Sequence, residues 1–250
     1  MRINDITMDD FVAGLERTRS LVVPFGSVEE HGPHLPLGTD TFQAEHVANE
    51  LAQRRDLFVA PAIPYGVCRS SSCHPGTVSL TVETLKHLAL DLVSDFYRQG
   101  LRCFVLLTGH AGGTHLSALI DAGEALIRRY EDIELAVLNE FMLAGDRCAD
   151  LVETRGDSHA GEIETSRLLQ THASLVNKAK IPQAEFPRFP DQGILVRDKQ
   201  RYWPGGVWGD PRKASAEKGR LLNEQLVVAL AELVDKLEAR LERGRSEASR

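Results

Sequence analysis

The 250-residue chain has no apolar run that approaches the roughly 20 residues of a membrane-spanning helix. Its first ten residues are acidic and mixed, unlike the basic and then apolar layout of a secretory signal. It has only four cysteines, and no two of them are spaced as CxxC, which excludes a disulfide framework as the basis of the fold. From these absences we expect a cytoplasmic protein with reduced thiols and no membrane contact.

Positive charge is scarce as well. The chain has 29 lysines and arginines against 36 aspartates and glutamates, a net charge of −7 with neutral histidines. Such a balance lacks the basic surface of a general nucleic-acid binder, so no nucleic-acid partner is expected. Hydrophobic residues make up 42% of the chain, which is ordinary for a globular protein and excludes intrinsic disorder. The length suits a single domain over residues 1–250.

Short apolar runs alternate with amphipathic stretches along most of the chain. The alternation predicts an α/β protein, a three-layer α/β/α sandwich with a mainly parallel central sheet. Thr39 or Asp40 can cap the first of the predicted helices. The predicted strands lie at 21–25, 57–60, 103–107 and 133–138, and the predicted helices at 40–51, 85–96, 116–127 and 162–171.

The last third of the chain contains two segments of a different kind. Residues 182–211 hold five of the eleven prolines, which excludes a helix interior or a central strand there. The segment is predicted to be an ordered covering loop, because Trp203 and Trp208 argue against a linker. Leucines at alternating three- and four-residue steps then predict a C-terminal helix over 214–243, with an apolar stripe for the core or for a subunit contact.

Acidic and imidazole side chains are concentrated directly after the first predicted strand. Within twelve residues, among glycines and prolines that force turns, the chain places Glu29, Glu30, His31, His34 and Asp40. In extended backbone Glu29 and His31 point the same way, and the turns can return Asp40 towards them. Imidazole with carboxylate is a ligand set for zinc, manganese or iron rather than calcium. The stretch predicts a metal site, and the alternative is a group of solvated loop residues.

A second candidate lies just beyond the apolar run at 103–107. His110 falls at the carboxyl end of that predicted strand, where open α/β sheets bind ligands. His115 begins the next predicted helix and could be only a surface histidine, so we prefer His110 as a ligand. The glycines around His110 spell neither GxGxxG nor a Walker loop, so the pattern does not favour a nucleotide.

A third candidate lies at the start of the helix predicted over 162–171. His159 precedes this helix, and Glu162 and Glu164 occupy its first turn. The two glutamates could bind a metal ion, or they could simply favour the helix N-terminus through its dipole. The spacing is not HExxH, so the zincin arrangement is absent.

Four stretches together resemble the creatininase family of creatinine amidohydrolase-like enzymes. They are GSVEEHGPHLPLGTD at 26–40, HPGT at 74–77, GHAGG at 109–113 and HAGEIETS at 159–166. The resemblance implies a hydrolase of non-peptide C–N bonds, with two divalent metal ions per chain (Zn, Mn or Fe) at the carboxyl end of a parallel sheet. It also implies a small-molecule substrate and a homo-oligomer, commonly a hexamer.

The resemblance also implies roles for individual residues. Glu29 and His110 would hold one metal ion, His31 would hold the other, and Asp40 would bridge both. His159 matches the catalytic histidine of the family, and would pass a proton to the leaving nitrogen.

The chain departs from the creatinine-hydrolysing members at several positions. Gly112 stands where those members carry a glutamate ligand, and Glu164, with Glu162 as the alternative, is the expected replacement. At the two positions where the creatinine-hydrolysing members have tryptophans that close over creatinine, this chain has Phe141 and Arg155. Creatinine is therefore a less favoured substrate.

Three functions follow from these patterns. The favoured one is a metal-dependent amidohydrolase that cleaves a small cyclic amide or formamide with a water molecule activated between two metal ions. The glycine-rich motif is similar to relatives that deformylate a formamidopyrimidine, or that trim the mycofactocin precursor peptide, so a peptidase is the alternative, beside a creatinine amidohydrolase proper. The third is a non-catalytic protein in which a closed metal site stabilises an assembly.

Overall fold

One four-stranded parallel sheet forms the centre of the computed structural model, which describes residues 1–190 and 194–248. The strand order is β2-β1-β3-β4, and every neighbouring pair is parallel. In register, Val22 of β1 lies opposite Val105 of β3, which lies opposite Ala136 of β4. The strands are β1 (Ser20–Phe25), β2 (Phe58–Val59), β3 (Cys103–Thr108) and β4 (Glu134–Asn139).

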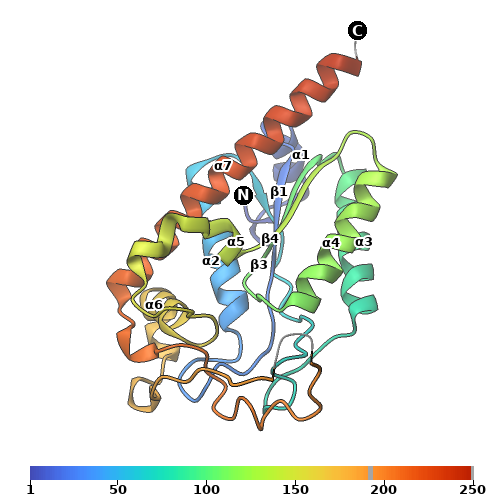
Figure 1. Cartoon of the computed structure of the whole chain (residues 1–250). Helices are drawn as coiled ribbons and strands as arrows, with labels where there is room; N and C mark the ends of the chain where they lie inside the picture. The colour runs from blue at the N-terminus through green and yellow to red at the C-terminus, as the bar shows by residue number, and fades with distance from the viewer. Residues whose placement is uncertain (191–193, 249–250) are drawn as a thin grey trace.

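Helices cover both faces of this sheet, and the predicted three-layer sandwich is confirmed (Figure 1). One face carries α1 (Met8–Leu15), α3 (Val82–Arg98) and α4 (Gly113–Arg129). The other carries α2 (Thr39–Arg54) and the long α7 (Ala216–Ala248), whose C-terminal end projects beyond the rest of the molecule in Figure 1. None of the described helices combines the length and apolarity needed to span a lipid bilayer.

The central strands are apolar throughout because both of their faces are buried. Alternate residues of β1 enter different cores: Leu21 and Val23 pack with α3 and α4, whereas Val22 packs with α2 and α7. β3 repeats the pattern, with Phe104 in the first core and Val105 in the second. A strand buried on both sides needs this near-continuous apolar run.

The expected cap of α2 is wrong. The N-cap is Gly38, and no side chain accepts a hydrogen bond from the first turn. Thr39 donates its hydroxyl to the Pro36 carbonyl, and the Asp40 carboxylate accepts a hydrogen bond from Ser27. Both side chains are therefore engaged elsewhere, which overrides the local capping preference.

The remaining elements are short and lie mainly between β4 and α7. The helix α6 packs against α7, and α5 follows β4 directly. Residues 191–193, inside the segment expected to form a covering loop, lie outside the described residues. These elements are α5 (Glu140–Ala144), α6 (Glu162–Thr171) and the 3-10 turns η1 (Ile3–Asp5), η2 (Gly145–Leu151), η3 (Ala173–Leu175), η4 (Lys178–Lys180) and η5 (Pro211–Lys213).

The chain changes direction across the sheet between β1 and β3. From β1 it passes through α2 on one face to β2, and from β2 it returns through α3 on the other face to β3, on the far side of β1. The segments that leave the carboxyl ends of β1 and β3 therefore diverge, to α2 on one face and to α4 on the other, which leaves a crevice between them. Open α/β sheets bind their ligands at such a switch point.

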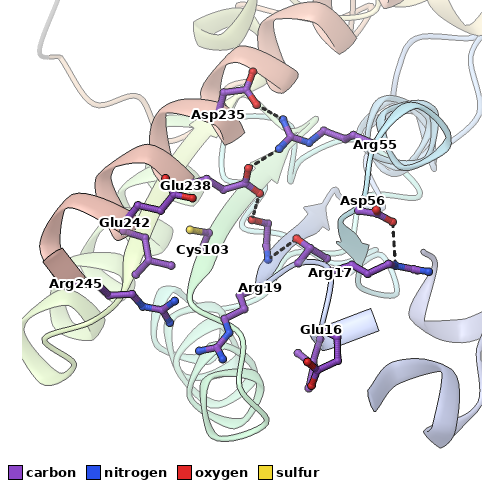
Figure 2. Close-up of a pocket in the computed structure, with 14 residues that line it drawn as sticks. Glu16, Arg17, Arg19, Arg55, Asp56, Cys103, Asp235, Glu238, Glu242 and Arg245 are labelled. Carbon is purple, nitrogen blue, oxygen red and sulfur yellow. Dashed lines mark hydrogen bonds and ion pairs between the residues drawn. The ribbon is translucent and has the colours of Figure 1, made fainter. Parts of the chain in front are cut away.

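A second cavity, of about 620 Å³, lies at the opposite, amino ends of β1 and β3 (Figure 2). Its charged walls are held by ion pairs: Arg55 contacts Asp235 and Glu238, and Arg17 lies 3.3 Å from Asp56. Ser20 donates its hydroxyl to Glu238 at 2.5 Å. Asp56, Asp235 and Glu238 therefore have arginine partners at this end.

Candidate metal centre

Five side chains named from the sequence converge at the carboxyl end of the sheet, and each residue is at most 6% exposed. Two follow β1, one follows β3, and the others lie in the first turns of α2 and α6. The sheet and two helix N-termini thus bring distant stretches of chain to one point. The five are Glu29, His31, Asp40, His110 and Glu164.

Asp40 lies between the two histidines. Its Oδ1 is 3.0 Å from Nε2 of His31, and its Oδ2 is 3.1 Å from Nδ1 of His110. Ser27 also donates its hydroxyl to Oδ2, at 2.5 Å. The two carboxylate oxygens therefore face different imidazoles, which is the arrangement that a bridging carboxylate requires.

The potential ligand atoms form groups on either side of Asp40. On one side, Oε2 of Glu29 lies 2.7 Å from Nδ1 of His110, and the Cys68 sulfur joins them. On the other side, Asp40 and His31 meet Glu164, whose Oε2 is 3.6 Å from Nε2 of His31. Within each group the candidate atoms lie within 4.8 Å of one another.

Backbone carbonyls orient both histidines. Nδ1 of His31 is 3.1 Å from the Glu29 carbonyl oxygen, and Nε2 of His110 is 3.2 Å from that of Val67. A ring nitrogen beside a carbonyl carries its proton, so in each neutral ring the other nitrogen presents a lone pair to the carboxylates. Metal-binding histidines are held in the same way.

The electrostatics of the cluster call for positive charge. Burial alone would lower the pKa of His31, but the charges of Asp40 and Glu164 raise it to about 10. Burial opposes ionisation of Asp40 too, yet His31 and His110 hold its pKa well below the usual range. Among the described residues, no lysine or arginine pairs with Glu29, Asp40 or Glu164. The donor set therefore fits divalent cations, which would replace the protons on the histidines.

The two glutamates at the start of α6 have different surroundings. Glu162 pairs with Lys218 and accepts the backbone N–H groups of Glu153 and Thr154, so its carboxylate is fully occupied. Glu164 faces the cluster and accepts the N–H of Ala160 at 2.6 Å. Of the two candidates, Glu164 is the one that joins the cluster, in a group with His31 and Asp40.

Gly112 cannot carry that ligand in this backbone. A Cβ atom built on Gly112 would lie 2.4 Å from Nε2 of His110, closer than any real contact. A side chain at this position would displace His110 from the Val67 carbonyl.

His159 lies beside the cluster, against its open side. Its ring centroid is 4.2 Å from that of His31 and 5.1 Å from that of Trp203. Its Nε2 lies 2.8 Å from the Glu30 carbonyl oxygen and 3.5 Å from the carboxylate Oε1 of the same residue. Although burial and the charge of His31 lower it, the hydrogen bond to Glu30 and nearby acids raise the pKa of His159.

A cavity of about 190 Å³ opens onto the cluster. Part of its wall is formed by the cluster and the histidine beside it: Glu29, Asp40, His110, Glu164 and His159. Its other walls include Arg69 and three aromatic residues of the proline-rich segment, Phe189, Trp203 and Trp208. The backbone of Trp208 pairs with that of His159, which ties this segment to the site.

Three residues near the cluster differ from what the sequence suggested. His115 is fully buried, so the alternative of a surface histidine is wrong: Thr108 and the Val67 N–H contact its two ring nitrogens. Burial lowers its pKa to about 3, which keeps the ring neutral. Cys68 was missed as a possible ligand, because no acid or histidine is its neighbour in sequence. Ser71, which donates to Glu29, was missed for the same reason.

Comparison with known proteins agrees with the resemblance. The sequence model of the creatininase family, described as creatinine amidohydrolase, matches residues 4–234. The mycofactocin precursor peptide peptidase of Mycolicibacterium smegmatis is 32% identical over 227 residues, which are 86% of this chain and 83% of the relative. The creatinine amidohydrolase of Pseudomonas putida is 26% identical over 230 residues, 86% and 88% of the two chains. A solved structure of creatininase with Mn has a TM-score of 0.86 and 25% identity, covering 94% of this chain and 97% of that one.

Proposed function

The chain belongs to the creatininase family of amidohydrolases, which hydrolyse carbon–nitrogen bonds, and from this premise we propose that it cleaves a small cyclic amide or formamide at a centre of two divalent metal ions. The observation that carries the proposal is the position of Asp40. One of its oxygens faces His31, and the other faces His110. A single carboxylate between two donor groups is what a dinuclear centre needs.

Asp40 would belong to both ions. Glu29 and His110 would hold one of them, and His31 and Glu164 would hold the other. Carboxylates and imidazoles together suit zinc, manganese or iron. Bound in this way, the pair would supply Lewis acidity, which lowers the pKa of water from 15.7 towards about 7 and polarises a carbonyl group.

His159 would move the proton that the reaction requires. Its ring lies against His31 and lines the cavity, so a bound substrate would lie within its reach. Glu30 holds the proton on Nε2 through its carbonyl and its carboxylate. With Nε2 engaged in this way, Nδ1 would take up the proton released by the attacking water and pass it to the leaving nitrogen, a step typically worth about 10²–10⁴-fold in rate.

The size of the cavity favours a small substrate. About 190 Å³ is below the range of pockets for drug-sized ligands, and the aromatic wall suits the flat face of a ring. Neither Phe141 nor Arg155 is among the residues that line this cavity, so creatinine itself is the less favoured substrate.

A peptidase is the second candidate, because a mycofactocin precursor peptide peptidase is 32% identical to this chain. It requires a substrate that enters as an extended chain, whereas the cavity holds only about 190 Å³ and includes Phe189, Trp203 and Trp208 in its walls.

A substrate panel tests the proposal and separates these candidates. Protein purified without added metal would be analysed for its elements and then incubated with formamides, lactams, creatinine and short peptides. We expect hydrolysis of a formamide or lactam that is lost on chelation and restored by zinc, manganese or iron. Turnover of peptides alone would identify the peptidase. Tight metal binding without turnover would favour the closed structural site, and chelation without effect on turnover would contradict the metal centre.

The hexamer implied by the family resemblance stays a prediction, which sedimentation velocity tests. The cytoplasmic location stays a prediction as well.

A further inference from the structure

We infer that Cys68 supplies a thiolate ligand to the metal ion held by Glu29 and His110, so that the two metal positions differ in chemistry. The inference rests on the proposed two-metal function and adds to it a ligand from outside the sequence motifs. Its basis is the convergence of three buried donor atoms, from Glu29, Cys68 and His110, within 4.8 Å of one another.

The position of Cys68 is fixed from several sides. Its backbone N–H donates to the Ser79 hydroxyl at 2.9 Å. The preceding residue, Val67, donates its N–H to His115 and accepts from His110. The thiol is therefore held beside His110 by the same short segment that orients the His110 ring, and the residue is 1% exposed.

The position of Gly66 limits how far this segment can move. A Cβ atom at Gly66 would lie 2.8 Å from the Gly26 carbonyl oxygen and 2.8 Å from Nδ1 of His115. The backbone thus packs directly on the end of β1, from which the Glu29 loop begins. Cys68 and Glu29 share this support, so their separation is a property of the scaffold.

The number of protein ligands at each metal position shows what Cys68 would add. With the shared Asp40, each ion would have three protein ligands: His31 and Glu164 complete one position, and Glu29 and His110 complete the other. Gly112, two residues after His110, adds no further side chain. A thiolate from Cys68 would bring this second position to four protein ligands. Metal binding removes the thiol proton, as it does for other cysteine ligands.

The thiolate also makes the two positions selective. A site with sulfur, nitrogen and oxygen donors favours zinc or ferrous iron, whereas a site with one imidazole and two carboxylates also accepts the harder manganese ion. This difference predicts a centre that binds one zinc ion tightly and exchanges the other ion more freely.

Cobalt(II) substitution tests the inference without using activity. The full-length protein would be stripped with a chelator, loaded with cobalt(II) and examined for the near-ultraviolet thiolate-to-cobalt charge-transfer band. We expect the band in the wild type, its loss in Cys68→Ser, and its retention in Cys103→Ser. Cys103 is a matched control, because it is 2% exposed and lies at the opposite end of β3. Zinc affinity of Cys68→Ser should fall by at least about 100-fold, more than the loss of a residue that only supports a ligand.

Each outcome bears on a separate claim. Two cobalt ions bound without the band would overturn the role of Cys68 and leave the two-metal centre intact. No cobalt bound at all would overturn both. If Cys68→Ser fails to fold, the wild type still decides: X-ray absorption of the zinc-loaded wild type should show a sulfur neighbour of zinc at about 2.3 Å. A zinc ion with only nitrogen and oxygen neighbours would contradict the inference.

Discussion

Acidic side chains lie at both ends of the sheet, but their partners differ between the two ends. At the amino ends of β1 and β3, Asp235 and Glu238 pair with Arg55 (Figure 2). At the carboxyl ends, the only basic side chains that pair with Asp40 and Glu29 among the described residues are histidines. A guanidinium keeps its charge at any physiological pH, whereas an imidazole can give up its proton. Acids paired with histidine therefore leave room for a cation, and acids paired with arginine do not.

Burial sharpens the contrast. The Asp235 side chain is 67% exposed and that of Glu238 is 34% exposed, so water solvates both. Asp40 is 1% exposed and Glu29 is 2% exposed. Buried carboxylates without a permanent positive partner are expensive to maintain for stability alone, which is a reason to assign them a function.

The largest expected effect follows from removing the shared acid. Asp40→Ala should lose both metal ions and all measurable turnover, because each histidine then lacks the carboxylate that completes its group. Elemental analysis of the purified variant measures this directly. Asp235→Ala, at the amino end, is the control and should keep two ions per chain. A metal content of two ions per chain in Asp40→Ala would refute the bridging role.

A smaller effect is expected within one helical turn of α6. Glu164→Gln should lose one ion of the two, because its carboxylate faces His31. Glu162→Gln should keep both ions and lose about 1–3 kcal/mol of stability, since it gives up its charge-assisted bonds to Lys218 and the backbone. Metal analysis and denaturant unfolding of the pair separate the two roles. Loss of metal in Glu162→Gln but not in Glu164→Gln would reverse the assignment.

His159 can be tested for two roles, proton transfer and metal binding. His159→Ala should keep two ions and lose about 10²–10⁴-fold in kcat, because the ring would move a proton without holding metal. The measurement pairs elemental analysis with kcat on the substrate found by the panel. Loss of an ion from His159→Ala would place His159 among the ligands, as its proximity to Glu29 and His31 also allows.

The pH dependence of stability should differ between the two ends. The pKa of His31 rises from its ordinary value of 6.5 to about 10 in the metal-free fold, so its proton stabilises that fold fully below pH 6.5. This stabilisation is lost as the pH rises towards 10. Metal ions instead displace the proton, so they bind more tightly as the pH rises. The gap in Tm between loaded and stripped protein should therefore widen from pH 6.5 to 9.

Calorimetry of the loaded and stripped protein across this range provides the test. The arginine pairs at the amino end are present in both forms, so they contribute equally to the loaded and the stripped protein. A gap that narrows with pH would contradict protonation of the histidines in the stripped protein.

Much of this site could be predicted because its residues are close in sequence to strand ends. Glu29, His31 and His110 directly follow β1 and β3, and neighbouring parallel strands bring their carboxyl ends together. The sequence favoured Glu164 but left Glu162 as an alternative, because the choice depends on Lys218, 56 residues away from Glu162. Cys68 depends on a loop whose position is set by tertiary contacts to His115 and Ser79.

The predicted cap of α2 was wrong for a related reason. Local rules assign Asp40 to the helix N-terminus, but the Ser27 hydroxyl and two histidines compete for the same carboxylate. A buried charge takes the partners that satisfy it best, so local preference is overridden where function requires the side chain.

The smallest expected effect belongs to the amino end. Arg55→Ala should lower the free energy of unfolding by about 1 kcal/mol, because ion pairs with exposed acids contribute little and the released Asp235 and Glu238 remain solvated. Metal content and kcat should not change. Denaturant unfolding with elemental analysis measures both quantities on one sample. A large loss of metal in Arg55→Ala would mean that the two ends are coupled through β1 and β3, and that the contrast between them is not one of independent sites.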